Sequence, residues 1–443
     1  MAYQATSLLG SKGIGIEFTN KAVTPWGGLV LFSGLARQVG LERALREALP
    51  FELTSPNATD PVEIALAFMA GVLVGSRRLA HIERLRWDEG VRKIMGIKRF
   101  VSDTTMARFF RRFTAGKVTQ AYEVLMRWEL SKIPLAGKVL DLDSTIVERY
   151  GKQEGAWLGY NPKKHRRPSH HPLLATLGQR PWVVHAWLRS GNTASATGGA
   201  AFLDETLALL PAGTRIRFLR GDSGFGIEPF LRRVEEQGLH YAVSGRFTRG
   251  LRNLVAGIKD WRYLEPDVAV GEVMFQAQGW SRPRRIILIR QHAKEKDFVR
   301  GKELFDDPAY QAIITDLKGK PETIWRFYRG HAEVESNIRE LKWDYGIDGF
   351  CQKKFYATEA AFRMVCVTYN LVGLLQEKLG KKVYQTLGTL RTQLFAVGAI
   401  VGKTGRETTL RLSLAGPWRE QFIEGLARFF PTEKFNRGAV GSG

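Results

Sequence analysis

Residues 139–145 read Val-Leu-Asp-Leu-Asp-Ser-Thr, a short apolar strand pattern into which two aspartates are set. Side chains alternate along a strand, so Asp141 and Asp143 share one face while Leu140 and Leu142 share the other. A carboxylate inside an apolar strand is costly to bury unless a cation or a hydrogen-bond donor compensates its charge. We therefore expect a strand that ends at a functional aspartate, Asp143. Asp141 is either a second metal ligand or is satisfied by backbone or by a nearby arginine.

Short strands and helices alternate on the C-terminal side of this stretch, which indicates a mixed α/β domain. A basic, β-prone segment at 247–310 interrupts the alternation, as an insertion within one domain does. A strand at 312–316 and a long helix from Pro321 then resume it. The other expected elements are strands within 181–188, 214–223 and 240–245, helices at 202–210 and 227–237, a helix over 351–379, a further helix at 389–401 and a strand at 408–413.

The first 135 residues have a helical pattern, and one segment is well marked. Ser102 is the expected N-cap of a helix whose apolar residues recur at i, i+3, i+4 and i+7 and which ends near Gly116. Its other face is basic. The segment resembles a DNA-binding helix of the helix-turn-helix type, and the plainer interpretation is an amphipathic helix with a solvated basic face. The apolar positions are Met106, Phe109, Phe110 and Phe113, and the basic ones are Arg108, Arg111 and Arg112.

The composition indicates a polyanion partner. The chain has 443 residues, and its 66 Lys and Arg against 44 Asp and Glu give a net charge of +22. Such an excess is typical of nucleic-acid-binding proteins. Two cysteines are too few for a disulfide scaffold, a zinc finger or an iron–sulfur site. No apolar run approaches the roughly 20 residues of a membrane span, and the N-terminus lacks a signal-peptide pattern, so we expect a cytoplasmic protein without a membrane partner.

Asp222 is a further aspartate at the end of an expected strand, in the sequence Gly-Asp-Ser-Gly. Taken alone, that sequence is ordinary turn chemistry. Two strand-end aspartates and a glutamate from a helix can, however, converge on Mg²⁺ or Mn²⁺, which prefer carboxylate oxygens. Two such ions can activate a hydroxyl and stabilise the departing oxygen in phosphodiester cleavage.

The helix from Pro321 supplies a candidate for that glutamate. At 100° per residue, four of its polar or aromatic residues fall on one stripe about 21 Å long. A solvated helix surface would be the plainer interpretation if this helix stood alone. Gly330 costs a helix about 1 kcal/mol relative to Ala, which indicates that another group approaches it closely. The stripe comprises Tyr328, His331, Glu335 and Lys342.

Together these residues resemble the DDE transposases of bacterial insertion sequences, of the cut-and-paste type, in the branch with a Tyr-Arg-Glu-Lys signature. Tyr328, Glu335 and Lys342 have the spacing of that signature. Asp143 and Asp222 match the two aspartates of the family, in Asp-Ser-Thr and Gly-Asp-Ser-Gly-Phe. The resemblance covers nearly the whole chain, including the basic stretch after the first aspartate and the ending at 390–413.

The resemblance implies an α/β fold with a ribonuclease-H-like catalytic core. It implies a transposase that binds the inverted-repeat ends of its element, cleaves them by metal-dependent hydrolysis and joins the 3′-hydroxyl ends to target DNA. The implied partners are double-stranded DNA and a second copy of the chain, and the implied localisation is cytoplasmic and nucleoid-associated. The implied regions are a helical DNA-binding region (1–135), a core in two parts (136–246 and 311–350) separated by a β-rich insertion (247–310), and a mainly helical C-terminal region for dimerisation or DNA contact (351–443).

The resemblance also implies roles for single residues. Asp143, Asp222 and Glu335 would be catalytic and would hold two Mg²⁺ or Mn²⁺ ions, with no small-molecule cofactor. Tyr328, His331 and Lys342 would bind DNA beside them. A basic loop would also lie against DNA, although a solvated charge run is its plainer interpretation; it comprises Lys163, Lys164, Arg166 and Arg167. Trp261 and Trp280 are candidates for stacking on a flipped base, although most tryptophans of a chain lie in its core.

His331 departs from the family pattern, which usually has Arg at this position. Arginine is a permanent, bidentate phosphate clamp, whereas histidine is only partly charged near neutral pH. A second hypothesis is therefore a catalytically weak or inactive DNA-binding protein of transposase ancestry. A third interprets Asp141 and Asp143 as the Asp-x-Asp metal site of a nucleotide-sugar glycosyltransferase, which the charge of +22 disfavours.

Overall fold

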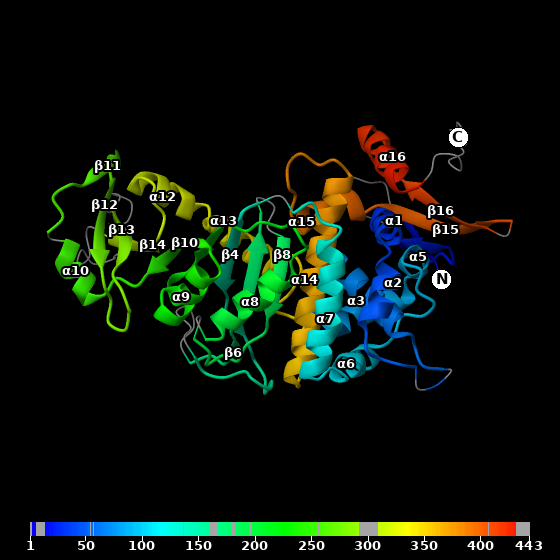
Figure 1. Ribbon diagram of the computed structural model, residues 1–443. Coiled ribbons are helices and arrows are strands. Elements are labelled where there is room, and N and C mark those ends of the chain that lie inside the picture. The colour runs from blue at the N-terminus through cyan, green and yellow to red at the C-terminus, as the bar shows by residue number, and fades with distance from the viewer. Residues whose placement is uncertain are drawn as a thin grey trace.

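Figure 1 shows the computed structural model of the protein, with a large sheet on one side of the long helix α14 (Phe355–Lys378) and a group of helices on the other. Of the 443 residues, the structure describes 2–5, 14–53, 55, 57–135, 137–159, 166–178, 182–194, 197–255, 257–291, 309–405 and 407–430. Lys163 and Lys164 of the predicted basic loop lie outside these ranges.

The strand expected at 139–145 is β4 (Val139–Ser144), and it lies inside a nine-stranded mixed sheet. Leu140 and Leu142 are fully buried, as the alternation predicts. β4 pairs antiparallel with β7 (Leu173–Leu177), a strand that the pattern did not indicate, and parallel with β9 (Phe218–Gly221). In order across the sheet, the strands are β11 (Arg262–Glu265), β12 (Val268–Phe275), β13 (Arg284–Gln291), β14 (Ala309–Thr315), β10 (His240–Gly245), β9, β4, β7 and β8 (Trp182–Trp187).

The strands of the segment at 247–310 continue this sheet. β13 pairs antiparallel with β14, which in turn pairs antiparallel with β10. The helix α12 (Pro321–Arg329) covers one face of the extension, where Ile324 and Trp325 pack against the strand residues Val270 and Ile313. The sequence does not distinguish such an extension from a separate insertion, because both bury an apolar β face.

The N-terminal helices pack on α14, which contacts α3, α6 and α7 as well as β8. The predicted cap at Ser102 is confirmed, because its hydroxyl accepts the Thr105 N–H at 3.2 Å. The helix ends at Arg111, and Gly116 lies instead in the first turn of α7. These helices are α1 (Leu29–Val39), α2 (Leu41–Ala48), α3 (Pro61–Leu73), α4 (Leu79–Ile82), α5 (Glu89–Ile94), α6 (Asp103–Arg111) and α7 (Ala115–Leu130).

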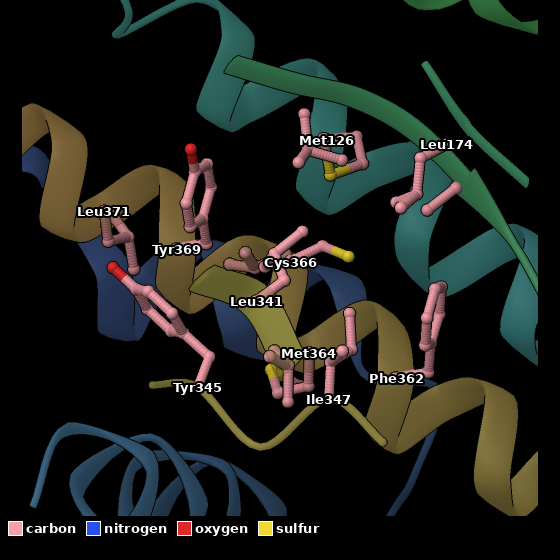
Figure 2. Packing of buried hydrophobic residues seen from close by; sticks show 14 of the residues in the cluster. Met126, Leu174, Leu341, Tyr345, Ile347, Phe362, Met364, Cys366, Tyr369 and Leu371 are labelled. Atoms are coloured by element: carbon pink, nitrogen blue, oxygen red, sulfur yellow. The ribbon is translucent and has the colours of Figure 1, made fainter. Parts of the chain in front are cut away.

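The core continues through α14 from the helices to the sheet. Figure 2 shows α14 residues such as Phe362 and Cys366 among Met126 of α7, Leu174 of β7 and Leu341. This continuity joins the helices to the sheet in one hydrophobic core. Two helices, α8 (Gly199–Leu209) and α9 (Glu228–Glu236), pack against each other, and α8 also packs on β8.

A buried asparagine attaches α14 to the edge of the sheet. Asn370 Oδ1 accepts the Val183 N–H at 2.9 Å, and its Nδ2 donates to the Val183 carbonyl at 2.8 Å and to Glu129 Oε2 at 2.9 Å. β8 is an edge strand, so this amide takes the place of a tenth strand at Val183. Burial raises the pKa of Glu129 well above its usual range, and the hydrogen bond with Asn370 opposes this rise.

The C-terminal region returns to the N-terminal helices. β15 (Gly398–Thr404) pairs with β16 (Glu407–Ser413) and with β3 (Ala22–Thr24). The helix expected at 389–401 is wrong in its second half: α15 (Leu387–Leu390) and a π-helical turn at 391–395 give way to β15. Pairing on both edges of β15 decides its conformation, and such long-range pairing overrides local preference.

The remaining described strands and α-helices are short or peripheral, and two 3-10 helices lie at Glu83–Trp87 and Ser223–Phe225. The strands and α-helices are β1 (Ala2–Ala5) paired with β2 (Ile14–Glu17), β5 (Val147–Glu148) paired with β6 (Ser169–His170), α10 (Arg249–Val255) and α16 (Pro417–Phe429), which packs on α1. Throughout the described ranges, no helix combines the length and the apolarity that crossing a membrane requires.

We predict that Asn370→Ala lowers the free energy of unfolding by about 3 kcal/mol, because it leaves buried polar groups of Val183 and Glu129 without a partner. Chemical denaturation of the full chain measures this loss. Asn253→Ala, at an exposed position of α10, is the control and leaves the stability unchanged. Equal stability of the two variants would contradict the role assigned to Asn370.

Candidate functional site

Asp143 and Asp222 lie at the carboxyl ends of two adjacent strands. Asp143 is the penultimate residue of β4, and Asp222 directly follows β9. Because the two strands pair in parallel, their ends meet at one edge of the sheet. The Ser144 hydroxyl donates to Asp222 Oδ2 at 3.3 Å, and Asp222 Oδ1 accepts the Gly224 N–H at 2.8 Å. Asp222 therefore both forms the expected turn and lies next to the end of β4.

Asp141 is held by cations. Arg220 of β9 donates to it from Nε at 2.8 Å and from Nη2 at 2.7 Å, and His331 Nδ1 lies 2.8 Å from its Oδ1. Asp141 is 4% exposed. The sequence left open whether Asp141 is a second metal ligand or is satisfied by backbone or by a nearby arginine. In the structure its carboxylate is paired with an arginine, Arg220.

The helix expected from Pro321 is broken at Gly330, and α13 (Ala332–Trp343) begins two residues later. In a continuous helix the His331 N–H would donate to the Phe327 carbonyl. Arg220 Nη1 donates to that carbonyl instead, at 2.8 Å, and the His331 N–H bonds to the carbonyl three residues back. A Cβ at Gly330 would lie 2.2 Å from Arg220 Nη1. Arg220 is thus the close neighbour that this glycine accommodates.

The residues of the predicted stripe surround the ends of β4 and β9. Lys342 Nζ donates to the Ile146 carbonyl just beyond β4 at 2.9 Å. The Tyr328 hydroxyl makes a long hydrogen bond, 3.5 Å, to the carbonyl of Gly221. Burial raises the pKa of Tyr328 to about 12, and three nearby carboxylates, among them Glu335, add to this rise, whereas a hydrogen bond with Ser244 opposes it.

The charges at this edge of the sheet influence one another. Burial raises the pKa of Asp143 to about 7; the positive charge of His331 opposes the rise, while Asp222 and Glu335 contribute to it. Burial opposes protonation of His331, but its hydrogen bond with Asp141 and the negative charges of Asp141 and Asp143 raise its pKa above the usual value. The raised pKa favours the protonated form of His331, whose positive charge compensates for part of the charge of Asp141 and Asp143.

Asp143, Asp222 and Glu335 all line one cleft, whose volume is about 1810 Å³. Asp143 is 8% exposed, whereas Asp222 is half-buried and Glu335 is exposed. The cleft thus leads from solvent to a nearly buried carboxylate. Among the described residues that line it, five are acidic and seven are basic: Arg77, Arg78, Arg111, Arg149, Arg339, Lys342 and Lys353.

The structure separates the three basic residues predicted around α6. Arg111 lines the cleft. Arg108 is exposed outside it. Arg112 contacts the loop before α3 instead: its Nη2 donates to the Glu52 carbonyl at 3.2 Å, and its guanidinium lies 4.3 Å from the ring centre of Phe51. Only Arg111 of this group is therefore placed with the carboxylates.

The described part of the predicted basic loop lies near the rim of the cleft. Arg166 has a φ of 62°, in the left-handed region that non-glycine residues rarely adopt. The guanidinium of Arg167 lies 4.6 Å from the ring centre of Tyr150, and Tyr150 lines the cleft. Arg167 is thus placed beside the cleft.

Trp261 and Trp280 lie with the outer strands and do not line the cleft. Both are partly buried. The guanidinium of Arg290 lies 4.5 Å from the ring of Trp261, and that of Arg284 lies 5.1 Å from the ring of Trp280. The structure does not bring these two tryptophans together with the carboxylates, and their role in base stacking stays a prediction.

Several residues of the cleft were not singled out from the sequence. Arg339 follows Glu335 by one helical turn, so helical spacing could have indicated it. Arg77 and Arg78 come from the loop between α3 and α4, and only the tertiary fold brings them to the cleft. His171 also lines the cleft; its Nδ1 lies 2.7 Å from the Thr193 carbonyl, which makes Nδ1 the protonated nitrogen.

The donor set of the cleft has the chemistry of a divalent-cation site. Three carboxylates line one cleft. Burial is the main cause of the raised pKa of Asp143, and the negative charges of Asp222 and Glu335 add to it, a repulsion that a bound cation would relieve. Within the described ranges, no three acidic, histidine or cysteine side chains are already arranged to hold a metal ion. The three carboxylates match the oxygen-donor preference of Mg²⁺ and Mn²⁺ and line one cleft, but they do not converge on a single point.

Glu340 connects α13 to the C-terminal region. Its carboxylate accepts the Leu387 N–H at 2.8 Å and the Tyr384 hydroxyl at 2.9 Å. Burial raises the pKa of Glu340 to about 7, and these two hydrogen bonds oppose the rise. The folded protein thus holds a proton on this carboxyl at pH values where the unfolded chain has lost it.

A protein-family model described as "Transposase DDE domain group 1" matches residues 6–434. Comparison with curated protein sequences gives no match. Among solved structures, the chain is similar to piggyBac transposase in a cryo-EM structure of its synaptic complex with hairpin DNA, with a TM-score of 0.45 and 10% sequence identity over 84% of this chain and 80% of that chain.

We predict a specific pH dependence of stability from Glu340. Because its pKa is raised in the folded state to about 7, the stabilisation from its proton is fully present below the unfolded-state pKa and is lost as the pH rises to about 7. Glu340→Gln, which cannot titrate, removes this loss. Melting temperatures from pH 4.5 to 8 should therefore shift in favour of Glu340→Gln as the pH rises. A constant difference between the two proteins across this range would contradict the assignment.

Proposed function

The chain belongs to the family described as Transposase DDE domain group 1, and from that premise we propose that it is the transposase of a bacterial insertion sequence, in the branch with the Tyr-Arg-Glu-Lys signature. It binds the inverted-repeat ends of its element as a homodimer on double-stranded DNA. It cleaves each end and joins the 3′-hydroxyl to target DNA. The observation that carries the proposal is that Asp143, Asp222 and Glu335, from three separate elements, line one basic cleft.

The arrangement of five strands supports a ribonuclease-H-like core. In the order β8, β7, β4, β9 and β10, β7 pairs antiparallel with both β8 and β4, and β4, β9 and β10 run parallel. In this core the first aspartate lies on β4 and the second follows β9. The glutamate comes from α13, after the strands of the insertion.

The three carboxylates would hold Mg²⁺ or Mn²⁺, with two ions per active site. Such ions lower the pKa of bound water and stabilise charge on phosphate oxygens. The chain supplies the surroundings. Asp143 is nearly buried and shielded from bulk water, Lys342 is fixed near the end of β4 through Ile146, and His331 brings positive charge beneath the acids.

The basic residues of the cleft would hold the DNA backbone. Lysine and arginine contacts with phosphates provide most of the sequence-independent affinity of proteins for DNA. Arg77, Arg78 and Arg111 reach the cleft from the N-terminal helices, and Arg339 and Lys342 come from α13. DNA between these two sides would lie across the carboxylates.

The two competing hypotheses fit the site less well. A DNA-binding protein that had lost activity would need no buried carboxylate with two more acids in its DNA cleft, and His331, the feature that favoured it, has a partner in Asp141. A glycosyltransferase would need Asp141 and Asp143 as joint metal ligands. Arg220 and His331 occupy Asp141, which leaves that pair incomplete.

We predict that Asp143→Asn, Asp222→Asn and Glu335→Gln each lower the rate of DNA cleavage by about 1000-fold or more, because each removes a carboxylate that the reaction needs. The substrate is DNA from the flanks of the gene, incubated with the full chain and Mg²⁺, and nicks are mapped at inverted repeats. End binding, measured by gel shift, should remain.

Glu333→Gln is the matched control. Glu333 is an exposed acid on the same helix, two residues before Glu335, and it does not line the cleft. This variant should cleave at the wild-type rate. Cleavage by Glu335→Gln at that rate would refute the site, and the absence of nicks with wild-type protein would refute the proposed reaction.

A further inference from the structure

Arg220 connects the two strands that position the candidate catalytic aspartates with the helix junction that precedes Glu335. It belongs to β9, two residues before Asp222, and lies opposite Asp141 in the parallel pairing of β9 with β4. Two of its nitrogens, Nε and Nη2, bond to the two carboxylate oxygens of Asp141. Its third, Nη1, donates to the Phe327 carbonyl at the end of α12. All three nitrogens of the Arg220 guanidinium therefore donate hydrogen bonds, which connect β9 with β4 and with the end of α12.

The third contact lies where the helix is interrupted. The Phe327 carbonyl, which the His331 N–H would use in a continuous helix, accepts from Arg220 instead. The guanidinium also lies 5.3 Å from the centre of the Phe327 ring. Glu335 follows this break by one turn, so the break sets the position from which its side chain approaches the cleft.

His331 completes the arrangement from the other side of the break. It is buried and bonds to the same Asp141 oxygen that Arg220 Nε uses. Asp141 thus binds the strand arginine and the residue that precedes α13 at once. This buried carboxylate is a connection between sheet and helix, and it lies two residues from Asp143 on the same strand face.

We propose that Arg220 is a positioning residue for the reaction, which fixes the strands of Asp143 and Asp222 to the helix junction before Glu335. The inference rests on the proposed function for its catalytic consequence, but not for the geometry that it assigns to the junction. Arg220 does not line the cleft, so it acts through the acids and not on the DNA.

Gly330 is the counterpart of Arg220. Its backbone has φ −60° and ψ −16°, which any residue can adopt, so conformation alone does not require glycine. The guanidinium does, because a Cβ at this position would lie 2.2 Å from Nη1. An alanine would therefore displace the guanidinium or the junction, although alanine is the better helix former.

Arg220→Lys tests the catalytic part of the proposal. Lysine keeps the positive charge beside Asp141 but cannot bond to Asp141 and to the Phe327 carbonyl in the same forked geometry. We expect the cleavage rate at saturating DNA to fall about 100-fold, the loss that a small misplacement of catalytic groups causes. The affinity for the DNA ends should be unchanged.

Arg284→Lys is the matched control. Arg284 is a buried arginine of the same sheet, 4% exposed and paired with Glu228 and Glu235, and it does not line the cleft. Its substitution should lower the melting temperature at least as much as Arg220→Lys and leave cleavage unchanged. Equal losses of cleavage in the two variants, or normal cleavage by Arg220→Lys, would overturn the positioning role.

A double-mutant comparison tests the junction without reference to DNA. Gly330→Ala should lower the melting temperature when Arg220 is present and raise it when Arg220 is already Ala, because the added methyl group then has space. Hydrogen exchange of residues 327–336 should accelerate in Arg220→Lys and not in Arg284→Lys. If the wild-type chain cleaves no DNA while these results hold, the proposed function fails and the junction stands. The same effect of Gly330→Ala in both backgrounds, with unchanged exchange, would overturn the junction.

Discussion

The buried charge of Asp141 is the constraint on which the site depends. An uncompensated carboxylate at this depth would cost several kcal/mol, and two cations from different elements compensate it: Arg220 of the neighbouring strand and His331 of the helix junction. Their bonds fix β4 and β9 in register and join them to the start of α13. The carboxyl ends of β4 and β9, where Asp143 and Asp222 lie, are therefore fixed in position relative to α13, which carries Glu335.

The sequence predicted the parts of this site that follow from local patterns. The alternation in 139–145 predicted β4 and its buried leucines, Ser102 predicted a helix start, and Gly330 predicted a close neighbour. It could not identify that neighbour as Arg220, because the contact joins residues more than a hundred positions apart. The sequence also predicted one continuous helix from Pro321. A hydrogen bond from a distant arginine to a helix carbonyl does not change the spacing of polar and apolar residues, so the break could not be seen in the sequence.

Long-range contacts also determine two further features that the sequence could not predict, one in the cleft and one in the C-terminal region. Arg77 and Arg78 line the cleft because the fold brings their loop to the end of α13, where Arg77 Nη2 donates to the Lys342 carbonyl, and nothing in their local sequence distinguishes them from solvated arginines. The strand β15 lies where a helix was expected because β3 and β16 pair with its two edges. The excess of Lys and Arg, in contrast, indicated a polyanion partner from composition alone, and seven of these basic residues line the same cleft as the carboxylates.

In the proposed function, Asp143, Asp222 and Glu335 together hold the divalent cations of one DNA-cleaving site. A crystal structure of the full chain with Mn²⁺ and a short duplex of the element's end, with anomalous diffraction to locate the metal, measures this directly. We predict Mn²⁺ in contact with all three carboxylates and with a phosphate at the end of the duplex. Mn²⁺ bound elsewhere, or DNA bound outside the cleft, would contradict the claim.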